Sequence, residues 1–145
     1  MHPIALIILV GLAGGIAVGI QSPLASLISQ RLGTLESVFI VHLGGALAAL
    51  ALLLLVGGSQ LGEWRTLPWW ALTAGVFGVV VVAAVSYTIP RVGVAAAILT
   101  VVAGQMLIST VLDHFGLLGV APRALEPTRL LGLAVVFVGV WLTVR

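Results

Sequence analysis

The stretch VFIVHLGGALAALALLLLV, residues Val38–Val56, decides the fold. It contains no Asp, Glu, Lys or Arg, and a hydrocarbon core about 30 Å thick is crossed by an α-helix of about 20 mostly apolar residues. A strand of a membrane β-barrel would instead alternate apolar and polar residues over about 10 positions, whereas Leu52–Val56 is apolar throughout. We therefore predict a transmembrane helix.

Four further stretches of similar composition surround this one. The five predicted helices cover approximately residues 3–30, 37–57, 68–89, 93–113 and 127–144. The chain is 61% hydrophobic and 7% charged, whereas an ordinary soluble domain is about half apolar and about a quarter charged. The sequence therefore predicts an all-α integral membrane protein with about five transmembrane helices in a single domain, residues 1–145, embedded in the lipid bilayer.

Prolines and glycines mark the predicted ends and interruptions. Pro127 suits the first turn of the last helix, where its missing N–H costs nothing. Pro90 and Gly93 leave room for a tight turn between the third and fourth helices. Gln21 and Pro23 interrupt the first span. Pro23 removes a helix hydrogen bond, which marks either a binding site, as in many transporters, or a simple kink.

Several protein classes are excluded by what the sequence lacks. It has no cysteine, and so no disulfide or thiolate metal site. GxGxxG, P-loop and HExxH signatures are absent, so we expect no enzyme, no cofactor and no metal site. Six scattered basic residues do not indicate nucleic-acid binding. No Lys or Arg precedes Arg31, so the apolar N-terminus lacks the basic region of a signal peptide.

The arginines are divided evenly between the two sides of the predicted membrane. Alternating loops place Arg31, Arg91 and Arg145 on one side and Arg65, Arg123 and Arg129 on the other. Positively charged loops stay in the cytoplasm and set orientation, so an even division favours dual topology. The alternatives are an even division by chance and an Arg129 that lies inside the helix and does not count. Many transporters contain two inverted repeats, and five helices would make one such repeat.

A series of residues in the second half carries a family resemblance: Gly104-Gln105, Ser109, Asp113-His114-Phe115-Gly116, Gly119, Arg123, Arg129, Gly132 and Gly139. The first half agrees in outline, with Gln21-Ser22-Pro23, Arg31-Leu32-Gly33, Trp69-Trp70 and Pro90-Arg91-Val92-Gly93. On these residues the chain resembles the YdcZ-like family, also called DUF606, of the drug/metabolite transporter (DMT) superfamily. One departure is Ala25, where the family pattern has asparagine; Ser22 and Ser26 are the nearest substitutes.

The resemblance implies a small protein of the bacterial inner (cytoplasmic) membrane that transports a small molecule or metabolite. Each chain would be one half-repeat of a ten-helix DMT-type transporter, completed by an antiparallel homodimer. Small multidrug antiporters of the same superfamily use a central glutamate in the first helix, which this chain lacks. A neutral or anionic metabolite, or passage without tight proton coupling, therefore fits better than a lipophilic cation. The alternatives are a non-transporting assembly or regulatory subunit and one half of a heterodimeric transporter.

The fourth predicted helix carries a polar stripe. Gln105, Ser109 and Asp113 recur every four residues and therefore share one face. Gln105 lies near the middle of its span, where its amide either binds a substrate or hydrogen-bonds a neighbouring helix. Asp113 lies at the membrane interface, where we expect a helix cap or an ion pair with Arg123.

Three polar residues of the other helices are also candidates. Gln21, His42 and Tyr87 fall in the same leaflet if the helices alternate, where they would line one mouth of a pathway. His42 either exchanges a proton or bonds to the backbone. Tyr87 is also explained as an interfacial aromatic residue.

Glycines predict where helices approach closely. Gly11, Gly15 and Gly19 form a ridge on the first helix, since glycine every four residues allows close contact with another backbone. Gly132 and Gly139 are seven residues apart and nearly share a face of the last helix. That helix is the predicted dimer contact.

Overall fold

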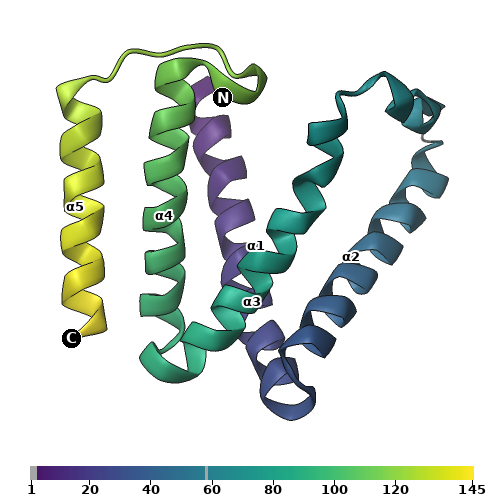
Figure 1. The fold of residues 1–145 in the computed structure, drawn as a ribbon, viewed down its shortest axis with the longest axis horizontal. Coiled ribbons are helices and arrows are strands. Elements are labelled where there is room, and N and C mark those ends of the chain that lie inside the picture. Colours follow the sequence, from purple (N-terminus) through teal and green to yellow (C-terminus); the bar gives the residue numbers. More distant parts are fainter. Residues whose placement is uncertain (1–2, 58) are drawn as a thin grey trace. The chain divides into compact units, whose positions relative to one another are not determined.

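A computed structural model describes residues 3–57 and 59–145. This part of the chain is helical, without strands, and has five segments long and apolar enough to cross a membrane, which confirms the predicted fold class. The α-helices are α1 (Pro3–Leu32), α2 (Thr34–Val56), α3 (Ala74–Val92), α4 (Val94–Phe115) and α5 (Pro127–Val144). Short 3₁₀ helices η1 (Ser59–Thr66), η2 (Trp69–Thr73) and η3 (Leu117–Gly119) connect them (Figure 1).

The chain reverses direction at single glycines rather than at the prolines. Gly33 separates α1 from α2 with φ 115°, and Gly93 separates α3 from α4 with φ 83°. Glycine adopts such positive φ values readily because it has no Cβ. Pro23 and Pro90 both lie inside continuous helices, so the expected interruption of the first span and the expected end of the third at residue 89 are not observed.

Two compact units divide between Tyr87 and Thr88. In the first unit, α1, α2 and α3 meet around a small core of Ala25, Val38 and Val82, with Val41 and Ala83 packed against it. The Ser37 hydroxyl donates a hydrogen bond to the backbone carbonyl of Ala25, 2.7 Å away, and so joins α2 to α1. Small side chains allow the helix backbones to approach closely at this end of the hairpin.

The second unit contains the antiparallel pair of α4 and α5, which lie side by side (Figure 1). A Cβ added to Gly139 of α5 would lie 3.7 Å from Leu99 Cδ2 of α4, so this predicted dimer glycine faces a helix of its own chain. The connection after α4 begins with Gly116 at φ 62°. It is then tied back by the backbone N–H of Arg123, which donates to the carbonyl of Asp113 at 2.7 Å.

Most large apolar side chains lie on the surface of the chain. Leu54 and Leu55, for example, are 75% and 81% exposed. Such a surface is unsuited to water, but lipid tails are as apolar as leucine and accept it without cost. The apolar surface therefore faces lipid or the helices of a partner.

Candidate functional site

The polar stripe on α4 divides into an unpaired and a paired part. Gln105 and Ser109 are exposed, and neither side chain has a hydrogen-bond partner among the described residues. The hydroxyl of the neighbouring Thr110, by contrast, donates to the carbonyl of Met106 at 2.7 Å. Unpaired polar groups are costly at membrane depth. Gln105 and Ser109 therefore require a partner outside the α4–α5 pair: a substrate, water or another helix.

Asp113, the third residue of the stripe, forms an ion pair with Arg129. Its Oδ2 lies 3.0 Å from Arg129 Nη2, and the two side chains are 27% and 37% exposed. The sequence predicted Arg123 in this place, but Arg123 contacts Asp113 through the backbone instead. The physical reason is position: Arg129 lies in the first turn of α5, beside the last turn of α4, whereas Arg123 lies in the extended connection between them.

His42 is half-buried between α2 and α3. Its Nδ1 lies 2.8 Å from the carbonyl of Val38, one turn earlier in α2, so in a neutral ring Nδ1 carries the proton and donates it. A Cβ added to Gly78 of α3 would lie 2.8 Å from His42 Nε2. The ring therefore occupies a notch that exists because residue 78 is glycine.

Gln21 and Tyr87 lie on the surface of the first unit. Gln21 is exposed on α1, and Tyr87 near the end of α3 is 60% exposed. These exposed positions differ from the half-buried position of His42. A pathway mouth made from all three residues would need a further wall from outside this unit.

The described chain thus combines apolar membrane-spanning helices with a few unpaired polar side chains. The family described as "Putative inner membrane exporter, YdcZ" matches residues 6–142. The chain belongs to this YdcZ family. It is a multi-pass inner-membrane protein from a family of exporters rather than of enzymes. No curated protein and no solved structure shows significant similarity to it.

One polar residue of this YdcZ-family chain was missed by sequence reasoning. Ser86 of α3 is 4% exposed, and its hydroxyl has no partner among the described residues. Pro90, one turn later, has no N–H to donate to the backbone carbonyl of Ser86. Both polar groups of one buried residue thus lack their ordinary helical partner, and the Ser-x-x-x-Pro spacing was the available signal.

The hydroxyls of the other buried serines in the first unit have hydrogen-bond partners. Ser22 donates to the carbonyl of Val18 at 2.8 Å, and Ser26 accepts a hydrogen bond from Gln30 Nε2 at 3.2 Å. Ser22 and Ser26 flank Ala25 and are 5% and 1% exposed. Both hydroxyls are paired within α1, which makes Ser86 the exception among the buried serine hydroxyls of the described residues.

The described residues of this YdcZ-family protein contain no cluster of side chains that could bind a metal ion. No group of three or more His, Cys, Asp or Glu gathers there.

Proposed function

We propose that this chain carries a small molecule across the inner membrane as an antiparallel, dual-topology homodimer, with Gln105 and Ser109 facing the substrate pathway. The observation that carries the proposal is the unpaired state of these two side chains on a membrane-spanning helix. Polar residues within spans almost always face the bundle interior or a water-filled cavity. A second copy would supply the enclosing wall that one chain lacks.

Gln105 suits contact with an uncharged or anionic polar group. It lies eleven residues after Val94, roughly 16 Å along α4 at about 1.5 Å per residue, which is near the middle of the bilayer. Its amide offers both a donor and an acceptor. The one acidic residue of α4, Asp113, is already paired with Arg129. This arrangement favours a neutral or anionic metabolite over a cation.

Two observations support the antiparallel dimer: the number of spans in one chain and an open glycine ridge on α1. Five helices per chain make one repeat of a two-repeat transporter. A Cβ added to Gly11, Gly15 or Gly19 meets no atom within 4 Å, so the ridge is open to a helix of a second copy. We place the dimer contact at this ridge in preference to the α5 face that contains Gly139.

The proposed roles of Gln105 and Ser109 in transport are tested with cells that express either the native protein or a variant. The amounts of metabolite that these cells release into the medium are compared. We expect Gln105→Leu to reduce release of the exported metabolite at least tenfold, because apolar leucine cannot replace the amide's hydrogen bonds in the pathway. Ser109→Ala should reduce it about threefold. Thr110→Val is the matched control, since its hydroxyl is already bonded to Met106. Unchanged release by Gln105→Leu at equal protein levels would favour the non-transporting subunit.

Dual topology is tested separately by labelling single cysteines, since the native chain has none. Gln60→Cys lies between α2 and α3, and Leu35→Cys lies at the start of α2, so the two mark opposite membrane sides. In intact cells an impermeant thiol reagent should label about half of each variant, because the arginines are evenly divided. Complete labelling of one variant and none of the other would exclude dual topology and indicate a heterodimer or a fixed orientation.

A further inference from the structure

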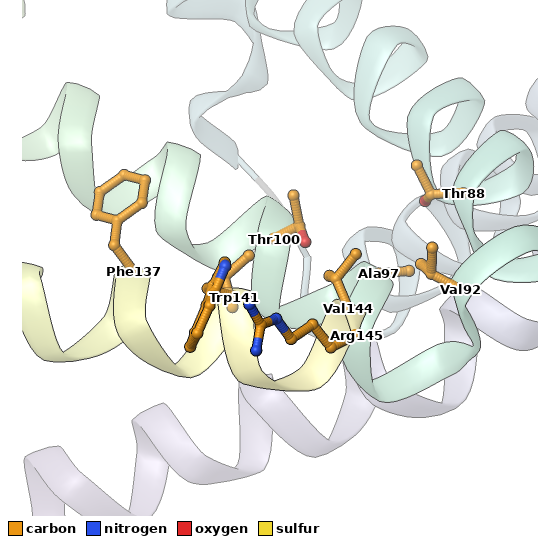
Figure 2. A pocket seen from close by; sticks show the side chains of 9 residues that line it. Thr88, Val92, Ala97, Thr100, Phe137, Trp141, Val144 and Arg145 are labelled. Atoms are coloured by element: carbon orange, nitrogen blue, oxygen red, sulfur yellow. The ribbon is translucent and has the colours of Figure 1, made fainter.

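A groove of about 560 Å³ lies within the second unit, between the end of α3, the start of α4 and the end of α5. Figure 2 shows the side chains that line it. Ala97, Phe137, Val140 and Val144 provide apolar walls. The hydroxyl of Thr100, which also lines the groove, is already bonded to the carbonyl of Ala96 at 2.8 Å. The body of the groove therefore suits a hydrocarbon chain.

The charged end of the groove is Arg145. Its guanidinium carbon lies 3.6 Å from the centroid of the Trp141 ring, a stacked cation–π arrangement that restrains the side chain. Figure 2 shows the guanidinium lying against the indole. The lining residues include no Asp or Glu. A groove with an apolar body and one positive end is complementary to a molecule with a hydrocarbon chain and a negative head.

The groove reaches the ends of three helices that are long and apolar enough to span a membrane. Its lining includes Val92 and Ala97, which flank the turn at Gly93, together with the last residues of α5. These are the ends of membrane spans, where arginine extends its charge into the interface while its stem stays in contact with apolar surface.

We propose that this groove binds one acyl chain of an anionic phospholipid from the surrounding bilayer, with the lipid phosphate held by Arg145. A planar guanidinium donates two parallel hydrogen bonds to a phosphate. The volume falls within the range of about 300–1,000 Å³ that is typical of small-molecule sites. The site lies within one chain, so it requires neither the proposed dimer nor transport through Gln105.

The proposal is tested by quenching of Trp141 fluorescence. The chain has four tryptophans, so a Trp64→Phe, Trp69→Phe, Trp70→Phe variant leaves Trp141 as the reporter. It is reconstituted in phosphatidylcholine vesicles that contain either brominated phosphatidylglycerol or brominated phosphatidylcholine. We expect half-maximal quenching at about a fivefold lower fraction of the anionic lipid, the ratio that corresponds to about 1 kcal/mol for one arginine near the surface.

Arg145→Gln in the same background should reduce this ratio to about one. Arg123→Gln is the matched control, because Arg123 lies in the connection before α5 and does not line the groove. It should leave the fivefold ratio unchanged. Equal quenching by the two lipids before any arginine is replaced would overturn head-group recognition. Equal loss of the preference in both arginine variants would also overturn it.

The position of the acyl chain is tested by filling the groove. Thr100→Phe should weaken quenching by both brominated lipids at least twofold, and unchanged quenching would overturn placement of the chain in the groove. If a second copy occupies the groove instead, both lipids will fail to quench Trp141 and Val140→Cys chains will form a disulfide-linked dimer. That pair of results would replace the lipid with a protein partner. A failure of the transport assay changes none of these outcomes.

Discussion

The two helix hairpins of this chain are held together by different means. The α1–α2 hairpin turns at one glycine, packs small residues together and buries the Ser37–Ala25 hydrogen bond completely. The α4–α5 hairpin has a longer connection and is tied by a partly exposed ion pair between Asp113 and Arg129. A buried hydrogen bond within close packing tolerates little change, whereas a partly exposed ion pair contributes little to stability. The first hairpin should therefore be the more sensitive one.

The largest expected effect is at Ser37, whose exposure is 0%. Ser37→Leu should destabilise the protein by about 1–3 kcal/mol through overpacking, because the larger side chain would be forced against Ala25, itself 1% exposed. The measurement is equilibrium unfolding in mixed micelles.

Ser37→Ala is the matched variant for this position. It removes the hydrogen bond but keeps the space, and should cost only about 0.6 kcal/mol, the average found for polar contacts between membrane helices. Similar losses for the leucine and alanine variants would show that packing at this end of the hairpin is loose.

A smaller effect is expected where His42 of α2 occupies the notch at Gly78 of α3. A Cβ at residue 78 would lie 2.8 Å from His42 Nε2, so Gly78→Ala must displace a ring that is held by the carbonyl of Val38. We expect a loss of about 1 kcal/mol, comparable to one hydrogen bond, in the same unfolding measurement.

The control for this notch is Gly75→Ala in the same helix. A Cβ there meets no atom within 4 Å, so this variant reports the helix-propensity gain of alanine alone. Replacing His42 by alanine should abolish the cost of Gly78→Ala. If the cost persists in the double variant, something other than the imidazole fills the notch.

Hydropathy alone was sufficient to predict the five spans, because each must exclude charge over the thickness of the bilayer. The helix ends were harder to predict. Pro90 looked like an end, yet a proline only removes one hydrogen bond and restricts its neighbours, and the chain actually reverses at Gly93. Gly139 looked available for a dimer, yet it packs against Leu99 of the same chain. Sequence spacing identifies the face of a helix but not the helix that covers it.

The candidate site was predictable to a similar degree. The stripe of Gln105 and Ser109 follows from helical periodicity, and the structure adds that neither side chain is paired within the described chain. The arginine partner of Asp113 depends on the path of the connection after Gly116, which no local pattern specifies. Ser86 was missed because an isolated serine in a span is ordinarily expected to bond to its own helix.

The smallest expected effect is at the ion pair of the second hairpin. Arg129→Gln should lower the free energy of unfolding by about 0.5 kcal/mol at low salt, within the usual range for partly exposed ion pairs. The cost should nearly vanish at 1 M salt, where the screening length falls to about 3 Å. Arg123→Gln should change nothing at either salt concentration, because its link to Asp113 runs through the backbone.

A double variant decides whether the ion pair acts as one unit. Asp113→Asn combined with Arg129→Gln should cost no more than either change alone, since each single change already removes the attraction. A combined cost equal to the sum would mean that the two side chains stabilise α4 and α5 separately. If either single variant lowers the free energy of unfolding by more than about 3 kcal/mol, the ion pair is shielded from water in the membrane. The two hairpins would then be equally intolerant of change.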